Sequence, residues 1–259
     1  MMAFFYQAGI ALYTLAIRVA ALFNPKARAW TRGRKGWKKQ ISEAFDPGDK
    51  VVWFHAASLG EFEQGRPVIE ACRKEYPAHK ILLTFFSPSG YEQRKDYEGA
   101  DHVMYLPADC RRNARFFTRA FHPVLAIFIK YEFWYNYMAE LKKKEVPVVF
   151  ISALFRKQQA FFKGYGGWFR ERLRQVDHFF VQDDASAEML SSIGITELTR
   201  SGDTRFDRVA DILDSGGENP AVARFCKGHR VLLAGSTWPP DEEILSSLPG
   251  KFPELKLII

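Results

Sequence analysis

Short apolar runs alternate with longer amphipathic stretches between residues 51 and 193, and this alternation restricts the possible folds strongly. The runs are rich in β-branched and aromatic residues, as strands are. Strands that alternate with helices predict βαβ units, which form a parallel sheet with helices on both faces. The predicted strands are Val51–His55, Lys80–Phe85, His102–Leu106, Val124–Ile129, Pro147–Ile151 and His178–Gln182. The predicted helices between them include Pro67–Tyr76, Phe133–Lys144 and Ala185–Ile193.

A boundary is expected in the turn-rich segment 214–220, and a second βαβ unit is expected after it. Its predicted elements are a strand at Arg230–Ala234, a helix at Asp241–Leu248 and a strand at Leu255–Ile259. Because the chain stops within an apolar run, residues 214–259 are interpreted as the start of a second domain that is truncated here.

The segment Ala3–Phe23 is apolar, and Arg18 is its only charged residue. About 20 such residues suffice to cross a bilayer. We therefore expect residues 1–25 to form a membrane-anchor helix, which either spans the bilayer or lies in its surface. Arg18 keeps the second arrangement open. The alternative is a helix that packs onto the folded domain.

Basic residues are concentrated between Lys26 and Lys39, where there are seven and no acidic residue. Without those seven, the 37 basic residues of the chain fall to 30, equal to its 30 acidic residues. The surplus is local, which argues against a nucleic-acid partner. Residues 26–49 are predicted to be a juxtamembrane linker that contacts anionic membrane lipids from the cytoplasmic side, with Trp30 and Trp37 at the interface.

The sequence lacks several common cofactor signatures. It has no G-x-G-x-x-G, no P-loop and no metal-ligand cluster, and its three cysteines lie far apart. These absences argue against a dehydrogenase, a P-loop kinase, a zinc enzyme and a disulfide-stabilised protein. We expect neither a cofactor nor a metal.

Ligands of open α/β sheets bind outside the carboxyl ends of the strands. The first predicted strand runs into Ser58-Leu59-Gly60-Glu61. Since proline is tolerated in a first helical turn, Pro67 predicts that the helix begins there and that Glu61 lies in a loop. Glu61 is then either a general base for a substrate hydroxyl or an ordinary capping or solvated residue.

Other strand ends carry further candidates. Ser87 and Ser89 either bind a sugar or phosphate, or cap a helix. Lys130 and Glu132 either serve a site or pair with each other structurally. The remaining candidates for a cleft between two domains are the anion-binding Arg205 and the turn residues Gly202, Gly235, Ser236 and Thr237.

In order and spacing, these segments resemble the transferases of 3-deoxy-D-manno-octulosonic acid (Kdo) in lipid A assembly. The fragments that carry the resemblance are Arg32-Gly33-Arg34-Lys35, His55…Ser58-x-Gly60-Glu61, Ser87-Pro88-Ser89-Gly90, Tyr105-Leu106-Pro107, Glu132-x-Trp134-x-Asn136, Gln182, Gly202…Phe206-Asp207 and Ala234-Gly235-Ser236-Thr237. Each fragment is weak alone, but together they cover nearly the whole chain in register.

The resemblance implies a GT-B fold of two Rossmann-like domains. Residues 50–213 would then be the acceptor domain, and 214–259 the start of the nucleotide-sugar domain. It implies an inverting transfer of Kdo from CMP-Kdo to a lipid A precursor at the bacterial inner membrane, with the catalytic domain on the cytoplasmic face. Glu61 would be the base, and Arg205 would stabilise the transition state without a metal. Ser58, Gly60, Ser87, Ser89 and Asn136 would belong to the acceptor site.

Two departures from the family pattern concern charge. Lys130 stands where many relatives have glutamate, so Glu132 or another group would take that role. Ser152-Ala153-Leu154-Phe155-Arg156 stands where the family pattern is Asn-Ala-Arg-Leu-Ser, and Arg156 is a candidate for the displaced positive charge. The alternatives are another membrane-associated GT-B glycosyltransferase, a nucleotide-sugar epimerase, or a membrane-tethered binding module without catalysis. We expect residues 1–259 alone to be inactive, because the CMP-binding residues of the family lie mostly in the second domain.

Overall fold

The structure, a computed structural model, describes residues 2–214, 216 and 219–259. It divides them into a first unit that ends at Arg208 and a second unit from Val209 to Ile259. The division falls before the expected boundary at 213/214, and hydrogen bonds hold Asp203 and Thr204 in the first unit. The helix α10 (Arg205–Asp214) crosses the division.

The first unit is built on a parallel sheet of seven strands in the order β3-β2-β1-β4-β5-β6-β7. The strands are β1 (Val51–Ala56), β2 (Lys80–Phe85), β3 (His102–Tyr105), β4 (Pro123–Ile129), β5 (Val148–Ala153), β6 (His178–Val181) and β7 (Leu198–Arg200). The predicted parallel α/β sheet is confirmed, with strand bounds within two residues. The edge strand β7 was not predicted.

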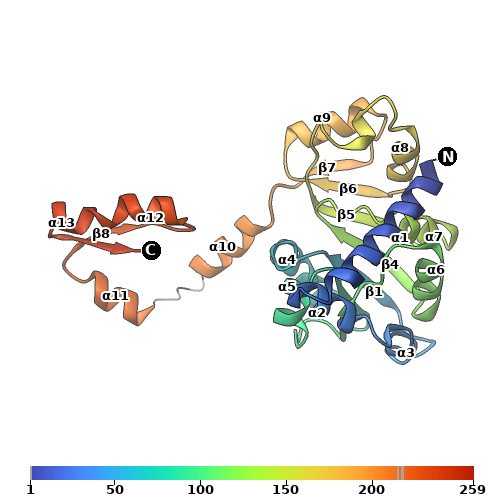
Figure 1. Cartoon of the computed structure of the whole chain (residues 1–259), viewed down its shortest axis with the longest axis horizontal. Coiled ribbons are helices and arrows are strands. Elements are labelled where there is room, and N and C mark those ends of the chain that lie inside the picture. Colours follow the sequence, from blue (N-terminus) through green and yellow to red (C-terminus); the bar gives the residue numbers. More distant parts are fainter. Residues whose placement is uncertain (1, 215, 217–218) are drawn as a thin grey trace. The chain divides into compact units, whose positions relative to one another are not determined.

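Helices cover both faces of this sheet, with α4 and α5 on one side and α6 and α7 on the other (Figure 1). Successive residues of β1 enter two separate cores, Trp53 on one face and Phe54 on the other. Both faces are therefore buried, which explains the continuous apolar runs. The helices after β1 are α4 (Leu59–Glu75), α5 (Pro88–Arg94), α6 (Arg111–Ala120), α7 (Tyr135–Lys143), the 3-10 turn η1 (Ala160–Phe162), α8 (Gly167–Leu173) and α9 (Asp184–Ser192).

The start of α4 corrects one sequence expectation. The helix begins at Leu59, so Pro67 lies inside it and does not mark its first turn. Glu61 therefore lies in the first turn of α4 and not in a loop. Farther along, a Cβ atom at Gly65 would collide with the side chain of Ile129, so this glycine allows α4 to pack closely on β4.

The N-terminal segment forms α1 (Met2–Ala20), α2 (Pro25–Gly33) and α3 (Trp37–Ser42), so the basic linker is largely helical. Trp30 is buried against Phe86, which corrects its expected place at the membrane interface. Arg34 is also buried: its guanidinium donates hydrogen bonds to the carbonyls of Leu106 and Phe86, both at 2.8 Å. Burial lowers the pKa of Arg34 to about 9. This arginine fastens α2 to the domain and is not free to contact lipid.

The second unit contains α11 (Pro220–Cys226), β8 (Arg230–Leu233), α12 (Pro239–Ser246), α13 (Leu248–Lys251) and β9 (Leu255–Ile258). β8 and β9 pair in parallel, with Arg230 opposite Leu255. The predicted second βαβ unit is thus confirmed, although the predicted single helix is divided into α12 and α13.

Candidate active site

The candidate site lies where the strand order of the sheet reverses. After β1 the chain builds β2 and β3 on one side, then returns to place β4 on the other side of β1. Crevices at the carboxyl ends of such strands are the usual ligand sites of open α/β sheets. Here the first turn of α4, which follows β1, and the loop after β4 bring Glu61 and Glu132 close enough to interact electrostatically.

Glu61 is the third residue of α4, and its side chain is held by Ser58. The Ser58 backbone N–H donates to Glu61 Oε2 at 2.7 Å, and the Ser58 hydroxyl donates to the same oxygen at 2.9 Å. Nothing among the described residues donates to Oε1. Glu61 is buried, with 7% of its surface exposed. The carboxylate is therefore fixed in orientation, and its Oε1 has no donor among the described residues. The capping alternative is confirmed, whereas the role of Glu61 as a general base stays a prediction.

Glu132 follows β4, and its side chain is only 13% exposed. Burial and the negative charge of Glu61 raise the pKa of Glu132 to about 8. At neutral pH this carboxyl therefore holds a proton. Two neighbouring carboxyl groups that differ in protonation can serve different roles in one reaction.

His55 is the last residue but one of β1 and is completely buried. Its Nδ1 lies 2.9 Å from the Thr84 hydroxyl oxygen. Its Nε2 has no hydrogen-bond partner among the described residues and lies 3.9 Å from Glu132 Oε2. Burial lowers the pKa of His55 to about 3, so the ring is neutral. Sequence analysis included His55 in a motif but gave it no role.

Replacing Glu132 with Gln is expected to remove a pH dependence of folding. In the native protein the folded state keeps the Glu132 proton between its ordinary pKa of 4.5 and about 8, whereas the unfolded chain releases it. The free energy of unfolding therefore falls as pH rises through this window. The glutamine variant has no such proton to keep. The difference in free energy of unfolding, variant minus native protein, should therefore be about 1–3 kcal/mol larger at pH 8 than at pH 5. Urea unfolding at both pH values measures this, and Glu75→Gln, at an exposed site on α4, should show no such gain.

Lys130 and Arg156 do not pair with these carboxyls. Lys130 has a φ of +70°, and its ammonium lies 5.0 Å from the centre of the Tyr131 ring. None of the ion pairs within the described chain joins Lys130 to Glu132, although the positive charge of Lys130 partly offsets the rise in the Glu132 pKa. Arg156 is exposed, and its backbone N–H donates to Gln159 Oε1.

The other residues predicted for the acceptor site are Gly60, Ser87, Ser89 and Asn136, and they differ in exposure and in hydrogen bonding. Gly60 is exposed in the first turn of α4, with open space around it. Ser87 is the N-cap residue of α5, but its hydroxyl makes no capping hydrogen bond and lies 2.7 Å from that of Ser89. The Asn136 side chain donates to the Asp109 carbonyl at 2.5 Å and accepts from Gln7 at 2.7 Å. Both ends of Asn136 are therefore engaged in holding the fold.

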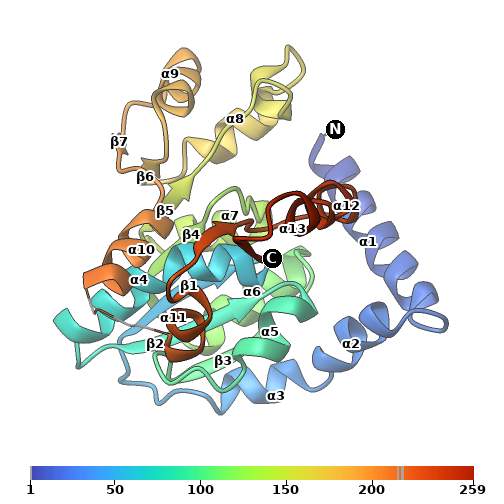
Figure 2. The ribbon, with the colours of Figure 1, turned by 90° about the vertical axis from the view of Figure 1, so that its left-hand side faces the viewer.

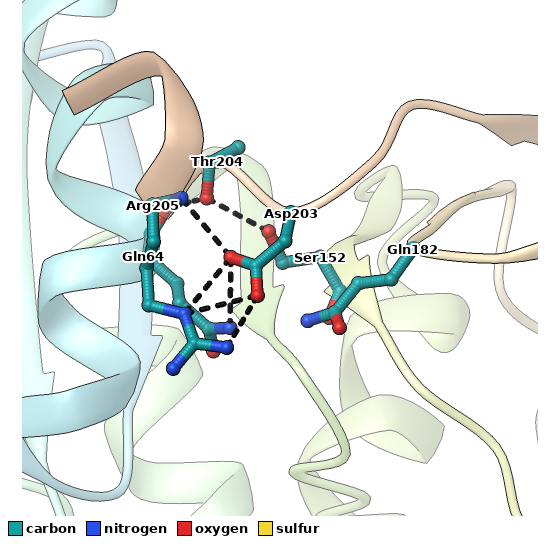
Figure 3. Close-up of polar contacts among 6 residues, drawn as sticks. All are labelled: Gln64, Ser152, Gln182, Asp203, Thr204 and Arg205. Carbon is teal, nitrogen blue, oxygen red and sulfur yellow. Dashed lines mark hydrogen bonds and ion pairs between the residues drawn. The ribbon is translucent and has the colours of Figure 1, made fainter. Parts of the chain in front are cut away.

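A second polar cluster joins α4 to the segment that follows β7 (Figure 3). Arg205 binds the Asp203 carboxylate through Nε at 2.9 Å and Nη2 at 2.5 Å. Asp203 also accepts a hydrogen bond from Gln64 Nε2 at 3.2 Å. Because Gln64 lies one turn after Glu61 on α4, Arg205 is tied to the helix that carries the candidate base.

Thr204 completes this cluster. Its hydroxyl donates to the Gln64 carbonyl and lies 2.9 Å from the Ser152 hydroxyl. The Ser152 carbonyl in turn accepts from Gln182 Nε2 at 3.0 Å. Figure 3 shows these residues converging from α4, β5, β6 and the 203–205 segment. Gln64, Ser152 and Asp203 were not among the predicted site residues.

Replacing Thr204 with Val should loosen this cluster. The Gln64 carbonyl and the Ser152 hydroxyl would lose a partner in a part-buried place, which costs about 1–3 kcal/mol of unfolding free energy. Urea unfolding measures the loss. Thr196→Val is the matched control, because Thr196 is exposed. Equal stability of the two variants would contradict the structural role of Thr204.

The turn residues expected near the donor lie in both units. Gly202 has a φ of +80°, which favours glycine, and leads from β7 into the 203–205 segment. Gly235, Ser236 and Thr237 connect β8 to α12 in the second unit. The Thr237 hydroxyl donates to Glu242 at 3.0 Å, so an acidic side chain already occupies this turn.

Within residues 2–214, 216 and 219–259, no group of three or more His, Cys, Asp or Glu side chains is arranged to hold a metal ion. The three cysteines are free and partly buried. Metal-independent chemistry remains a prediction.

Comparison with known proteins identifies the family. The family model for 3-deoxy-D-manno-octulosonic-acid transferase (kdotransferase) matches residues 30–208. The chain is 25% identical to the 3-deoxy-D-manno-octulosonic acid transferase of Haemophilus influenzae, over 94% of this chain and 58% of that protein. It is 26% identical to the protein of the same name from Chlamydophila psittaci, over 82% and 49%. The chain thus spans about half the length of the curated relatives it matches.

Solved structures support the fold alone. A UDP-GlcNAc 2-epimerase from Neisseria meningitidis matches with a TM-score of 0.56 at 15% identity, covering 80% of this chain and 64% of that one. The wall teichoic acid polymerase TagF matches with a TM-score of 0.51 at 12% identity, covering 95% and 64%. Both agree with the GT-B-like fold expected from the sequence. The family match extends over well over half of the chain, from α2 through the 203–205 segment, and includes both carboxyls of the candidate site. The chain belongs to the 3-deoxy-D-manno-octulosonic acid (Kdo) transferase family.

Proposed function

We propose that this chain carries the acceptor side of an inverting glycosyltransferase that moves Kdo from CMP-Kdo to a lipid A precursor. The observation that supports this most is the Glu61 carboxylate, which Ser58 holds by one oxygen while the other accepts no hydrogen bond from the described residues. A general base needs this combination of fixed geometry and a free acceptor.

In the proposed reaction, the hydroxyl of the acceptor sugar gives its proton to Glu61 Oε1. The hydroxyl oxygen forms a bond to the anomeric carbon of Kdo, and the bond from that carbon to the phosphate oxygen of CMP breaks. Attack from the face opposite the leaving group inverts the configuration. CMP leaves with the bonding electrons, and Arg205 stabilises the developing negative charge.

The proposed acceptor is a lipid, which places the reaction at a membrane. We propose the cytoplasmic face of the bacterial inner membrane, since basic residues follow the apolar N-terminal segment and the anionic lipids of the cytoplasmic leaflet attract such residues. The other partners are then CMP-Kdo and membrane lipids. No nucleic acid takes part.

The protein expressed from its complete gene tests this proposal. It is incubated with CMP-Kdo and tetraacylated lipid A precursor, and both CMP release and the Kdo-bearing lipid are measured by mass spectrometry. CMP release that equals lipid product is the expected result. Absence of product with CMP-Kdo, or product only with another nucleotide sugar, would overturn the proposed donor. Absence of transfer with every donor would favour the alternative that the protein is a membrane-tethered binding module without catalysis.

A further inference from the structure

The helix α1 is bonded to the side of the first unit. The Tyr6 hydroxyl donates to the buried Asp109 carboxylate at 2.5 Å, and Gln7 Nε2 donates to Asn136 Oδ1 at 2.7 Å. In the middle of the helix, the Tyr13 ring stacks on Phe86 with 6.2 Å between centroids. Figure 2 shows α1 and α2 running along one side of this unit. The helix thus contacts the domain both near its N-terminus and in its middle, and it does not project from the domain.

The other face of α1 is apolar and uncovered. None of the residues that the structure describes in α1 is buried. The exposed fraction is 72% for Phe4 and 67% for Leu12. The outward apolar residues of α1 are Phe4, Phe5, Leu12, Leu15 and Val19, and the exposed Leu22 and Phe23 follow directly after the helix. Soluble proteins rarely expose an apolar strip of this kind. We call these residues the apolar face of α1.

Positive charges flank this apolar face. A groove of about 480 Å³ beside α1 is lined by Arg18, Lys38 and Arg112. The helix α6 carries four exposed arginines and no acidic residue. Three of them, Arg111, Arg112 and Arg119, form no ion pair with any residue that the structure describes, and two of these, Arg111 and Arg112, line grooves beside α1. Unpaired cations beside an exposed apolar strip match the phosphates and acyl chains of a lipid surface.

By length and composition α1 is also able to cross a membrane, with 19 residues and a mean hydropathy of 1.3. A spanning α1 would have to leave the domain, which breaks the bonds from Tyr6 and Gln7 and leaves the buried Asp109 without one of its donors. It would also carry Arg18 into or near the hydrocarbon. A buried carboxylate that loses a donor and a charged side chain in the hydrocarbon both cost free energy.

We propose that α1 lies in the plane of an anionic phospholipid bilayer, with its apolar face in the acyl boundary and the cations of α6 on the headgroup phosphates. The whole first unit then sits on one leaflet. This lipid binding does not depend on the proposed sugar transfer.

The docked helix also lies close to the candidate site. Phe86, which stacks on Tyr13, packs against Trp134 with 4.6 Å between centroids, and Trp134 packs against His55 at 5.5 Å. A lipid-borne acceptor in the same leaflet would therefore meet the site directly. This consequence, unlike the lipid binding, rests on the proposed function.

Cysteine labelling distinguishes the in-plane helix from a spanning one. Ala3→Cys and Lys26→Cys are placed singly in the full chain, with Cys72, Cys110 and Cys226 changed to Ser. Inner-membrane vesicles of both orientations are treated with a membrane-impermeant maleimide. In-plane binding predicts that both positions react in inside-out vesicles only. Reaction of the two positions from opposite sides would overturn the proposal.

Vesicle flotation without any sugar substrate tests the lipid contacts. Protein should float with vesicles that contain phosphatidylglycerol and much less with pure phosphatidylcholine. Leu12→Glu should lower binding strongly, and Arg112→Glu by about tenfold. The matched controls are Tyr76→Glu and Lys157→Glu, at exposed sites away from α1 and α6, with thermal unfolding to verify the fold. Binding that is equal in variants and controls would overturn the proposal, whatever the transfer assay shows.

Discussion

Replacing Glu61 with Gln in the full-length protein is expected to lower the rate of Kdo transfer by about 10²–10⁴-fold, the usual contribution of a general base. The amide cannot take a proton from the acceptor hydroxyl. Its carbonyl oxygen still accepts from Ser58, where Glu61 Oε2 accepts at 2.7 and 2.9 Å, so the helix start should persist. Transfer is measured as Kdo-bearing lipid, with the acceptor concentration varied to separate kcat from KM.

The matched control is Glu75→Gln, which removes a carboxylate from the exposed end of the same helix. It should retain native transfer. The loss of the Glu61 charge at a helix N-terminus costs about 0.3–1 kcal/mol, so thermal unfolding should change little. A Glu61→Gln protein that is folded and transfers Kdo at the native rate would rule out Glu61 as the base.

The central strands of the sheet could be predicted from the sequence, whereas the edge strand β7 could not. The central strands are buried on both faces and hence mostly apolar, so their bounds followed from the residues. The edge strand β7 consists of Leu198, Thr199 and Arg200, and only Leu198 is partly buried. A strand this short and polar has no periodic signal. Its existence depends on pairing with β6.

The start of α4 was predictable, although Pro67 misled the prediction. Ser58-x-x-Glu61 matches the capping-box pattern, in which serine and glutamate satisfy a helix N-terminus reciprocally. Giving this pattern more weight than the preference of proline for first turns would have placed Glu61 on the helix. The local sequence therefore held the signal for the position of the proposed base.

Long-range contacts of the site were not predictable in this way. His55 lies near Glu132 only because β4 pairs with β1, and that order is a property of the whole sheet. Gln64 and Asp203 are 139 residues apart and belong to no shared motif. Single-sequence patterns predict elements, whereas these contacts arise from how the elements pack.

Replacing Arg205 with Gln should lower transfer by about 10²–10³-fold, the effect of losing one group that stabilises transition-state charge. Arg205 is bound in a bidentate manner by Asp203, yet its side chain remains 62% exposed. Its charge is thus oriented and still accessible to a departing phosphate. Arg205→Lys keeps the charge but loses the planar fork, so it should lose less activity than Arg205→Gln.

The control for Arg205 is Arg200→Gln. Arg200 is also 62% exposed and also pairs with an aspartate, Asp184, at 3.2 Å. Exposed ion pairs contribute about 0–1 kcal/mol, so both substitutions should leave the free energy of unfolding nearly unchanged. Transfer should fall only at position 205. Asp203→Asn adds a separate test, because it weakens the hold on Arg205 without removing the guanidinium. If Arg205 acts through an oriented charge, Asp203→Asn should reduce kcat less than Arg205→Gln, whereas equal rates in all these proteins would mean that the charge takes no part in transfer.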